Sequence, residues 1–232
     1  MTTLTEMRSA VRDRLDEQTA AAWSDQQLNR WINDIVRDVA RRTMSLQTTT
    51  TPISVATGDK TFMLPSDVYR VQMVMAYEPD VATSTNPQKL EYIDQRSAAR
   101  HYTNLSTGSP RFFSTWGVAP NVAASIYPIP DMDLEIVVSY YKIPTDASSD
   151  GNDLDLNDGW TDLVVDGVEY MALRMDRNPA WQDAKALYEQ HLQDAIESMS
   201  MWVDELGMID DTVGAGIMSG LPRWLTSWEG GI

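Results

Sequence analysis

The sequence contains no cysteine and only two histidines, His101 and His191. Without cysteine the chain can form no disulfide, offers no thiolate to a metal and has no cysteine nucleophile. The two histidines lie far apart in the sequence. His191 falls within a helical apolar pattern, near Tyr188 and Ala195, so a partly buried packing role is favoured over catalysis.

Long apolar runs are also missing. No stretch of roughly 18 consecutive apolar residues occurs, so the sequence predicts no membrane-spanning helix. The segment Met1–Leu15 is polar and charged and lacks the apolar core of a secretory signal. Together with the lack of cysteine, this is consistent with assembly inside a reducing cytoplasm.

Basic residues are scarce. The 232 residues include 34 acidic and 18 basic side chains, which gives a net charge of −16. Such a surface repels phosphate, so direct binding to nucleic acid is not expected. A channel wall along which DNA must slide would benefit from the same charge. Solubility alone, or a high-salt or marine host, is the simpler explanation, since net charge bears more on solubility than on fold.

The motifs of common enzyme classes are absent. The sequence has no Gly-x-Ser-x-Gly elbow, no His-Glu-x-x-His pair, no phosphate-binding glycine loop and no dinucleotide fingerprint. A pair of carboxylates acting as in a glycosidase remains open, because such residues meet only through the fold.

One acidic stretch, Asp153–Gly159, has the alternating acids of a calcium-binding loop. Its glycine falls one position late, however, and Val164 occupies the position where such a loop needs a glutamate. We therefore interpret it as a solvated linker in which Asn157 or Asp158 caps the following helix. The whole connection from Asp146 to Asp158 is expected to be exposed, as is the earlier loop from Glu78 to Pro87.

Helical patterns occupy both ends of the chain. A first helix is predicted over Thr5–Leu15 and a second up to about Met44, which begins at a capping box formed by Ser24 and Gln27. The apolar stripe of the second helix consists of Leu28, Trp31, Ile32, Ile35, Val36 and Val39.

The C-terminal half returns to helix after the linker. A helix is predicted over Trp160–Met175, with Gly167 as a weak point. Asn178 can cap the next helix, which carries apolar residues at helical spacing as far as Leu206. Gly207 is expected to end it.

The middle of the chain is rich in threonine, valine, tyrosine and proline, and it predicts strands. A short helix capped by Asp94 is expected through Arg100. The expected strands are Thr48–Val55, Lys60–Leu64, Val68–Tyr77, Arg111–Val118, Ala123–Tyr127 and Leu134–Tyr141.

This order predicts an α+β fold, in which a helical bundle formed by the two chain ends carries an inserted antiparallel β-domain and a C-terminal arm. Two sequential domains would leave the first two helices without a partner for their apolar stripes. The expected parts are residues 1–47 and 146–207 for the bundle, 48–145 for the β-domain and 208–232 for the arm.

The expected arm ends in large apolar residues, Trp224, Leu225, Trp228 and Ile232. Exposed aromatic side chains in a glycine-containing tail usually need a partner surface, so these four residues are a candidate interface. The alternative is a tail that folds back onto its own domain.

The order of these features resembles the head-to-tail adaptor (connector) proteins of tailed phages, a group that includes tail tubular protein A, or gatekeeper, of short-tailed phages. The resemblance covers about Thr5–Leu206. The motifs that carry it are Trp23–Leu28, Trp31–Asn33, Phe62–Val71, Gly108–Phe113, Tyr127–Asp131, Val137–Tyr141 and the return to helix at Trp160.

The resemblance implies a non-enzymatic virion protein without a cofactor, made in the host cytoplasm. It implies a homo-oligomeric ring, usually dodecameric, that docks beneath the portal protein and binds a downstream nozzle, stopper or tail tube. DNA would pass through the ring without specific binding. Two other functions stay open from the residues alone: a carbohydrate- or surface-binding module carried by the β segment, and a carboxylate-pair hydrolase.

Overall fold

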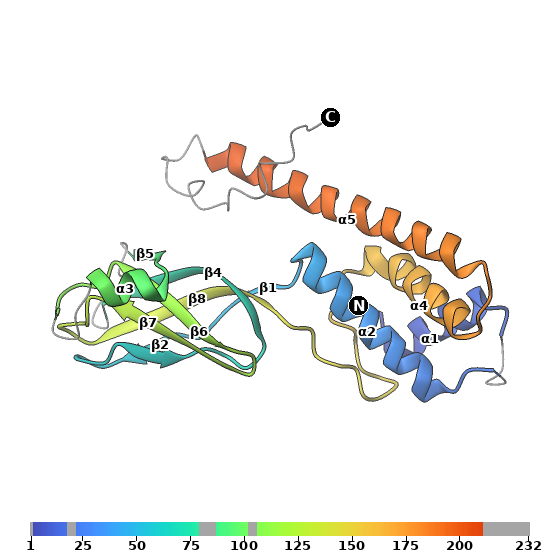
Figure 1. Ribbon diagram of the computed structural model, residues 1–232, viewed down its shortest axis with the longest axis horizontal. Helices are drawn as coiled ribbons and strands as arrows, with labels where there is room; N and C mark the ends of the chain where they lie inside the picture. The colour runs from blue at the N-terminus through green and yellow to red at the C-terminus, as the bar shows by residue number, and fades with distance from the viewer. Residues whose placement is uncertain (1, 18–21, 79–86, 102–105, 211–232) are drawn as a thin grey trace.

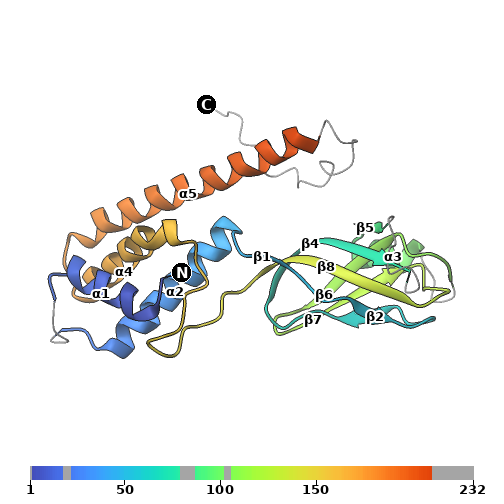
Figure 2. The same ribbon diagram turned by 180° about the vertical axis from the view of Figure 1, so that it is seen from behind.

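The computed structural model describes residues 2–17, 22–78, 87–101 and 106–210. A helical lobe and a β lobe lie end to end and are joined by two segments of chain (Figures 1 and 2). The helical lobe combines both ends of the described chain: α1 (Leu4–Arg14) and α2 (Asp25–Thr43) pack with α4 (Thr161–Met175) and α5 (Trp181–Asp210). The predicted bundle with an inserted β segment is confirmed.

Local capping fixes where the first helices begin. The hydroxyl of Ser24 accepts a hydrogen bond from the backbone N–H of Gln27 at 3.3 Å, as the capping pattern predicts. The start of α1 has a complete capping box that the sequence analysis did not identify. There the Thr3 hydroxyl accepts from the Glu6 N–H, and the Glu6 carboxylate accepts from the Thr3 N–H at 2.8 Å.

The core of the helical lobe is built around the apolar stripe of α2. Trp31 is only 7% exposed, and its ring meets that of Trp23 edge to face at 5.1 Å between centroids. The buried side chains of this core are Leu4, Met7, Val11, Leu28, Trp31, Ile32, Ile35, Val36, Val39, Ala147, Leu154, Leu163, Val164, Val165, Val168, Ala172, Tyr188, Leu192 and Ala195.

Gly167, expected to weaken its helix, lies where three helices meet. A Cβ atom at this position of α4 would come within 2.7 Å of Ile35 Cγ2 on α2 and 3.0 Å of Tyr188 Cε2 on α5. The glycine therefore allows a close approach of the helices, which a side chain would prevent.

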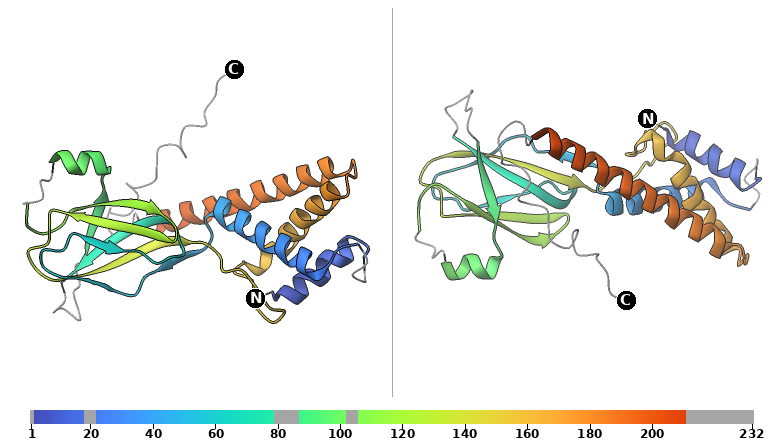
Figure 3. Two further views of the ribbon diagram at one scale, coloured as in Figure 1. Left: turned by 60° about the horizontal axis from the view of Figure 1, so that its bottom comes forward. Right: turned by 90° about the horizontal axis from the view of Figure 1, so that it is seen from above.

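The expected end of α5 at Gly207 is wrong, because the helix runs three residues further, to Asp210. Glycine in a helix costs about 1 kcal/mol but stops the helix only where the backbone turns left-handed, so a long helix can pass through it. The predicted start is close to the observed one, since the Asn178 side chain accepts from the Ala180 N–H at 3.0 Å. Figures 1 and 3 show α5 continuing past α4 towards the β lobe.

The β lobe is one curled sheet of eight strands in the order β1-β8-β4-β5-β6-β7-β3, with β2 also paired to β8. All pairs are antiparallel except β5 with β6, which are parallel and connected through α3 (Gln95–His101). The strands are β1 (Gln47–Thr49), β2 (Ile53–Val55), β3 (Thr61–Met63), β4 (Val68–Tyr77), β5 (Gln88–Tyr92), β6 (Phe112–Val118), β7 (Asn121–Tyr127) and β8 (Leu134–Lys142).

The turn between β2 and β3 makes the sheet curl. β2 pairs with β8 near one end of the strand order and β3 pairs with β7 at the other, so the short turn through Gly58 brings the two ends together. Gly58 has a φ of +86°, a conformation that glycine adopts readily. The curl encloses Val55, Phe62, Leu64, Val68, Val74, Ala76, Leu90, Phe113, Ala124, Ile126, Leu134, Ile136, Val138 and Tyr140.

Two strand predictions need correction. The run Thr48–Val55 forms two strands instead of one, because the chain breaks at Pro52, which has no N–H to donate to a ladder. Ahead of the break, the Thr50 hydroxyl accepts from the Val138 N–H at 3.0 Å. The strand β5 was not predicted. Leu90 is its one fully buried residue, so its sequence gives little alternation.

The linker after β8 is less exposed than expected. Ala147 and Leu154 are buried in the helical core, although several of their neighbours are exposed. The side chain of Asn33 on α2 donates to the Ala147 carbonyl at 3.0 Å and accepts from the Ala147 N–H at 2.9 Å. This pair of hydrogen bonds fixes the linker to the bundle. Most of the other expected loop, residues 79–86, lies outside the described residues.

Candidate interaction surfaces

The acidic stretch that suggested a calcium loop does not gather its carboxylates around a common point. Asp155 accepts from Lys142 Nζ and from the Thr145 N–H, both at 3.0 Å. Burial raises the pKa of Asp155, but these hydrogen bonds outweigh it and hold the pKa below its usual value. The Asn157 side chain accepts from the Gly159 N–H at 3.1 Å and so caps the short 3-10 helix Asp158–Trp160, whereas α4 itself, which was expected to receive this cap, has no side-chain cap. Among the described residues no group of three or more potential metal ligands comes together.

His191 is partly buried, as predicted, and it pairs with a carboxylate that the sequence analysis did not single out. Its Nδ1 lies 2.6 Å from Oδ2 of Asp166, whose side chain is 1% exposed. Arg14 of α1 binds the other oxygen of the same carboxylate and also contacts Glu169 at 3.3 Å. This cluster ties α1, α4 and α5 together. The sequence does contain a sign of this buried carboxylate, because Asp166 interrupts a run of apolar residues on α4.

A second polar contact fastens α5 to α2. The Tyr188 hydroxyl donates to Oδ2 of Asp38 at 2.9 Å, and Arg42 binds Glu189 through both carboxylate oxygens, the shorter contact being 2.6 Å. Burial of the phenol, reinforced by the Asp38 carboxylate, raises the pKa of Tyr188 above its ordinary value. The first half of α5 is therefore held rigidly on the bundle.

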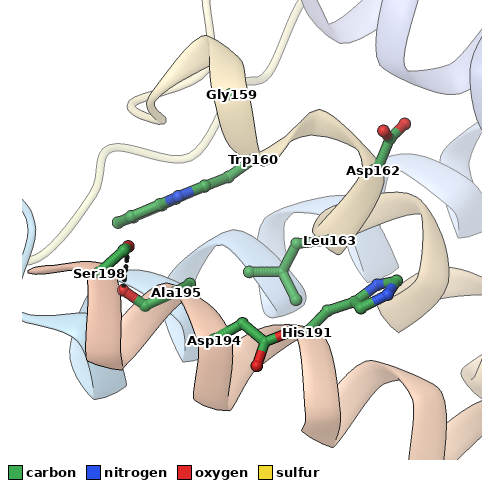
Figure 4. A pocket seen from close by; sticks show the side chains of 8 residues that line it. All are labelled: Gly159, Trp160, Asp162, Leu163, His191, Asp194, Ala195 and Ser198. Carbon is green, nitrogen blue, oxygen red and sulfur yellow. Dashed lines mark hydrogen bonds between the residues drawn. The ribbon is translucent and has the colours of Figure 1, made fainter.

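A shallow groove of about 300 Å³ lies between α5 and the start of α4 (Figure 4). Its lining residues are Gly159, Trp160, Asp162, Leu163, His191, Asp194, Ala195 and Ser198. In Figure 4, Leu163 lies between the indole of Trp160 and the imidazole of His191. The pairing of His191 with Asp166 thus positions one end of the groove.

The outer face of β3, β7 and β6 is a second candidate surface. The register of β6 with β7 and of β3 with β7 places Trp116, Ala123 and Met63 side by side, and Val118 lies further along β6. Trp116 is 41% exposed, Met63 57% and Val118 82%. Side chains on the solvent-facing side of a sheet are normally polar. Exposed apolar side chains at these positions therefore indicate a surface that contacts another protein.

That face is also free of charge, although 22% of the sequence is charged. The register places these residues on the same face: Phe112, Ser114, Trp116, Val118, Asn121, Ala123, Ser125, Tyr127, Thr61 and Met63. Ser114, Ala123 and Ser125 are buried beneath their larger neighbours, so the exposed part of the face centres on Trp116, Val118 and Met63. Periodicity alone could not identify this surface, because the strand order places β3 beside β7 only in the fold.

The candidate interface residues Trp224, Leu225, Trp228 and Ile232 lie outside the described residues, as does the side chain of His101. Their role as an interface therefore stays a prediction. Among the described helices, none is both long and apolar enough to cross a membrane.

Comparison with known families identifies the chain. The family model described as SU10 adaptor protein matches residues 2–212, which covers both lobes and ends just after α5. No curated protein sequence matches the chain. The family implies a structural, non-enzymatic role in the phage virion, with head and tail proteins as partners. The chain belongs to the SU10 adaptor protein family and is a phage head-to-tail adaptor.

Proposed function

We propose that the protein forms a closed homo-oligomeric ring, dodecameric by the resemblance described above, beneath the portal. The ring joins the DNA-filled head to a downstream nozzle, stopper or tail protein and lines the channel through which DNA leaves. The observation that carries this proposal is the family match over residues 2–212. The arrangement of a helical lobe and a β lobe end to end supports it, because one lobe can bind the portal while the other binds the tail (Figure 1).

The charge of the chain supports the channel role. With a net charge of −16 per copy, a ring of many copies is strongly negative overall, which favours a negative channel wall. Such a wall repels the phosphates of DNA and keeps the genome from adhering as it passes.

The same charge limits where copies can touch. Like-charged copies repel, so ring contacts form where charge is lowest, and the uncharged outer face of β3, β7 and β6 meets this requirement. A ring closes through two different surfaces on each copy, in a head-to-tail arrangement. We propose that Trp116, Met63 and Val118 provide one of these two surfaces.

The test is the mass of the purified protein, alone and with its portal protein, followed by imaging of the complex. A ring is expected, and Trp116→Glu should abolish it while leaving the thermal unfolding of the monomer unchanged, because the indole is already 41% exposed. Met175→Glu, at a residue 61% exposed on the helical lobe, is the matched control and should assemble normally. A monomer that stays monomeric on the portal would contradict the proposal.

A further inference from the structure

The groove between α4 and α5 combines an apolar floor with an acidic rim. Leu163 and Ala195 are buried at its base and Trp160 is half-buried. Asp162 and Asp194 are exposed, one on the α4 side and one on the α5 side (Figure 4). Within the part of the chain that the structure describes, neither carboxylate has a hydrogen bond or ion pair. A fitting occupant therefore carries a cation next to an apolar side chain.

The C-terminal segment of this same chain has that chemistry. Leu221–Trp228 places Arg223 directly before Trp224 and Leu225. Arg223 is also the only lysine or arginine after Lys185, so it stands out in an otherwise acidic and apolar stretch. An arginine between two carboxylates, with a tryptophan packed on an apolar floor, is the pattern of residues that dominate protein interfaces.

The chain length outside the described residues allows the contact. Ser198 is the last groove residue on α5, and the helix continues about 18 Å beyond it before ending at Asp210. Ten further residues, which span at most roughly 35 Å, separate the helix end from Leu221. The segment is therefore long enough to reach a groove of this shape, either on a neighbouring copy or on its own chain, and the test below separates the two.

We propose that Leu221–Trp228 of one copy docks in the α4–α5 groove of a neighbouring copy. Arg223 lies between Asp162 and Asp194, and Trp224 packs against Trp160 and Leu163. This inference rests on the proposed ring, in which copies stand side by side. The exchanged segment adds an attractive contact between subunits whose overall charge is repulsive.

The lack of cysteine makes a cross-linking test clean. Full-length chain with both Ser198→Cys and Thr226→Cys is oxidised and run on a non-reducing gel, and disulfide-linked dimers and longer ladders are expected. Mixing a Ser198→Cys chain with a Thr226→Cys chain should give linked heterodimers. The control pairs Thr226→Cys with Asp183→Cys, at an exposed position near the start of α5 that does not line the groove, and should give little product.

A charge reversal tests the recognition itself. Arg223→Glu should lower the cross-linked yield about fivefold, as expected for the loss of one solvent-accessible ion pair. Adding Asp194→Arg to that chain should restore the yield, whereas adding Asp183→Arg should not.

Two outcomes would overturn the inference: no cross-link between chains, or a link formed only within one chain, which would show that the segment occupies its own groove. Neither outcome bears on the proposed ring. The ring is tested separately, by the mass of the unmodified protein with its portal protein. A ring without the cross-link would therefore leave the function standing and remove this contact from it.

Discussion

At the scale of single residues, Gly167 shows how one missing side chain controls the packing of three helices. We expect Gly167→Ala to destabilise the protein by about 1 kcal/mol. Overpacking against Ile35 and Tyr188 costs about 1–3 kcal/mol, whereas the better helix propensity of alanine recovers about 1 kcal/mol. Urea unfolding followed by circular dichroism measures the change.

The control for this change is Gly151→Ala, because a Cβ at Gly151 meets no atom within 4 Å. It should alter stability by less than about 0.5 kcal/mol. If Gly167→Ala were instead more stable than the natural chain, the three helices would not be as closely packed as the structure indicates.

Tyr188 gives a prediction that depends on pH. Removing its hydroxyl in Tyr188→Phe should cost about 1 kcal/mol near neutral pH, through loss of the hydrogen bond to Asp38. The folded protein raises the pKa of this phenol above its ordinary value of 10.0, so the contribution is complete below that pH. It is lost as the pH rises from there towards the folded pKa, because the deprotonated oxygen cannot donate.

The measurement compares the unfolding free energies of Tyr188→Phe and the natural chain at about pH 8 and about pH 11. The difference between them should shrink at the higher pH. Asp38 keeps its contacts with Arg41 and Arg42 in the variant. A loss of several kcal/mol in unfolding free energy would therefore show that the aromatic ring had left the core, and not only that the hydroxyl was missing.

At the scale of elements, the patterns that predicted correctly were those with a wide apolar face. The stripe of α2 has only one way to be buried, and the capping residues around Ser24 fix its start. The end of α5 at Gly207 and the strand β5 were missed for the opposite reason. A glycine between helix-forming residues does not decide the backbone conformation, and a strand with one fully buried side chain carries almost no periodic signal.

The interaction surfaces were harder still to predict. The groove depends on the angle between α4 and α5, and the uncharged face depends on strand order, so neither is a property of any one segment. Asp166 could have been recognised from the sequence, because a carboxylate within an apolar helical pattern is expected to be buried and then needs a partner. The identity of that partner, His191 across the helix pair, came only from the fold.

The linker between β8 and η1 (Asp158–Trp160) supplies a prediction about an element. Asn33→Ala should leave both backbone groups of Ala147 without their partner and destabilise the bundle by about 2 kcal/mol. The linker should also become more accessible to proteases around residues 146–150. Limited proteolysis with mass analysis of the first fragments tests this. Cleavage at the same rate in both proteins would show that the linker is held by other contacts.

At the scale of the whole molecule, the net charge of −16 per copy sets the conditions for assembly. Repulsion between copies is screened by salt, with a Debye length of about 30 Å at 0.01 M and about 8 Å at 0.15 M. We therefore expect ring formation to strengthen as salt is raised over this range, while the unfolding of the monomer changes little. Sedimentation velocity at several salt concentrations is the measurement. Weaker assembly at higher salt would show that attractive ion pairs dominate the ring contacts.

The chain enters and leaves the β lobe at one place. Gln47 and Tyr141 face each other where β1 pairs with β8, and the Lys142 N–H donates to the Leu46 carbonyl at 2.9 Å. An insertion whose two ends are already joined in this way can be replaced by another without disturbing the bundle that carries it. Recombination between phage lineages can therefore replace the β lobe as a unit while the helical bundle that carries it stays the same.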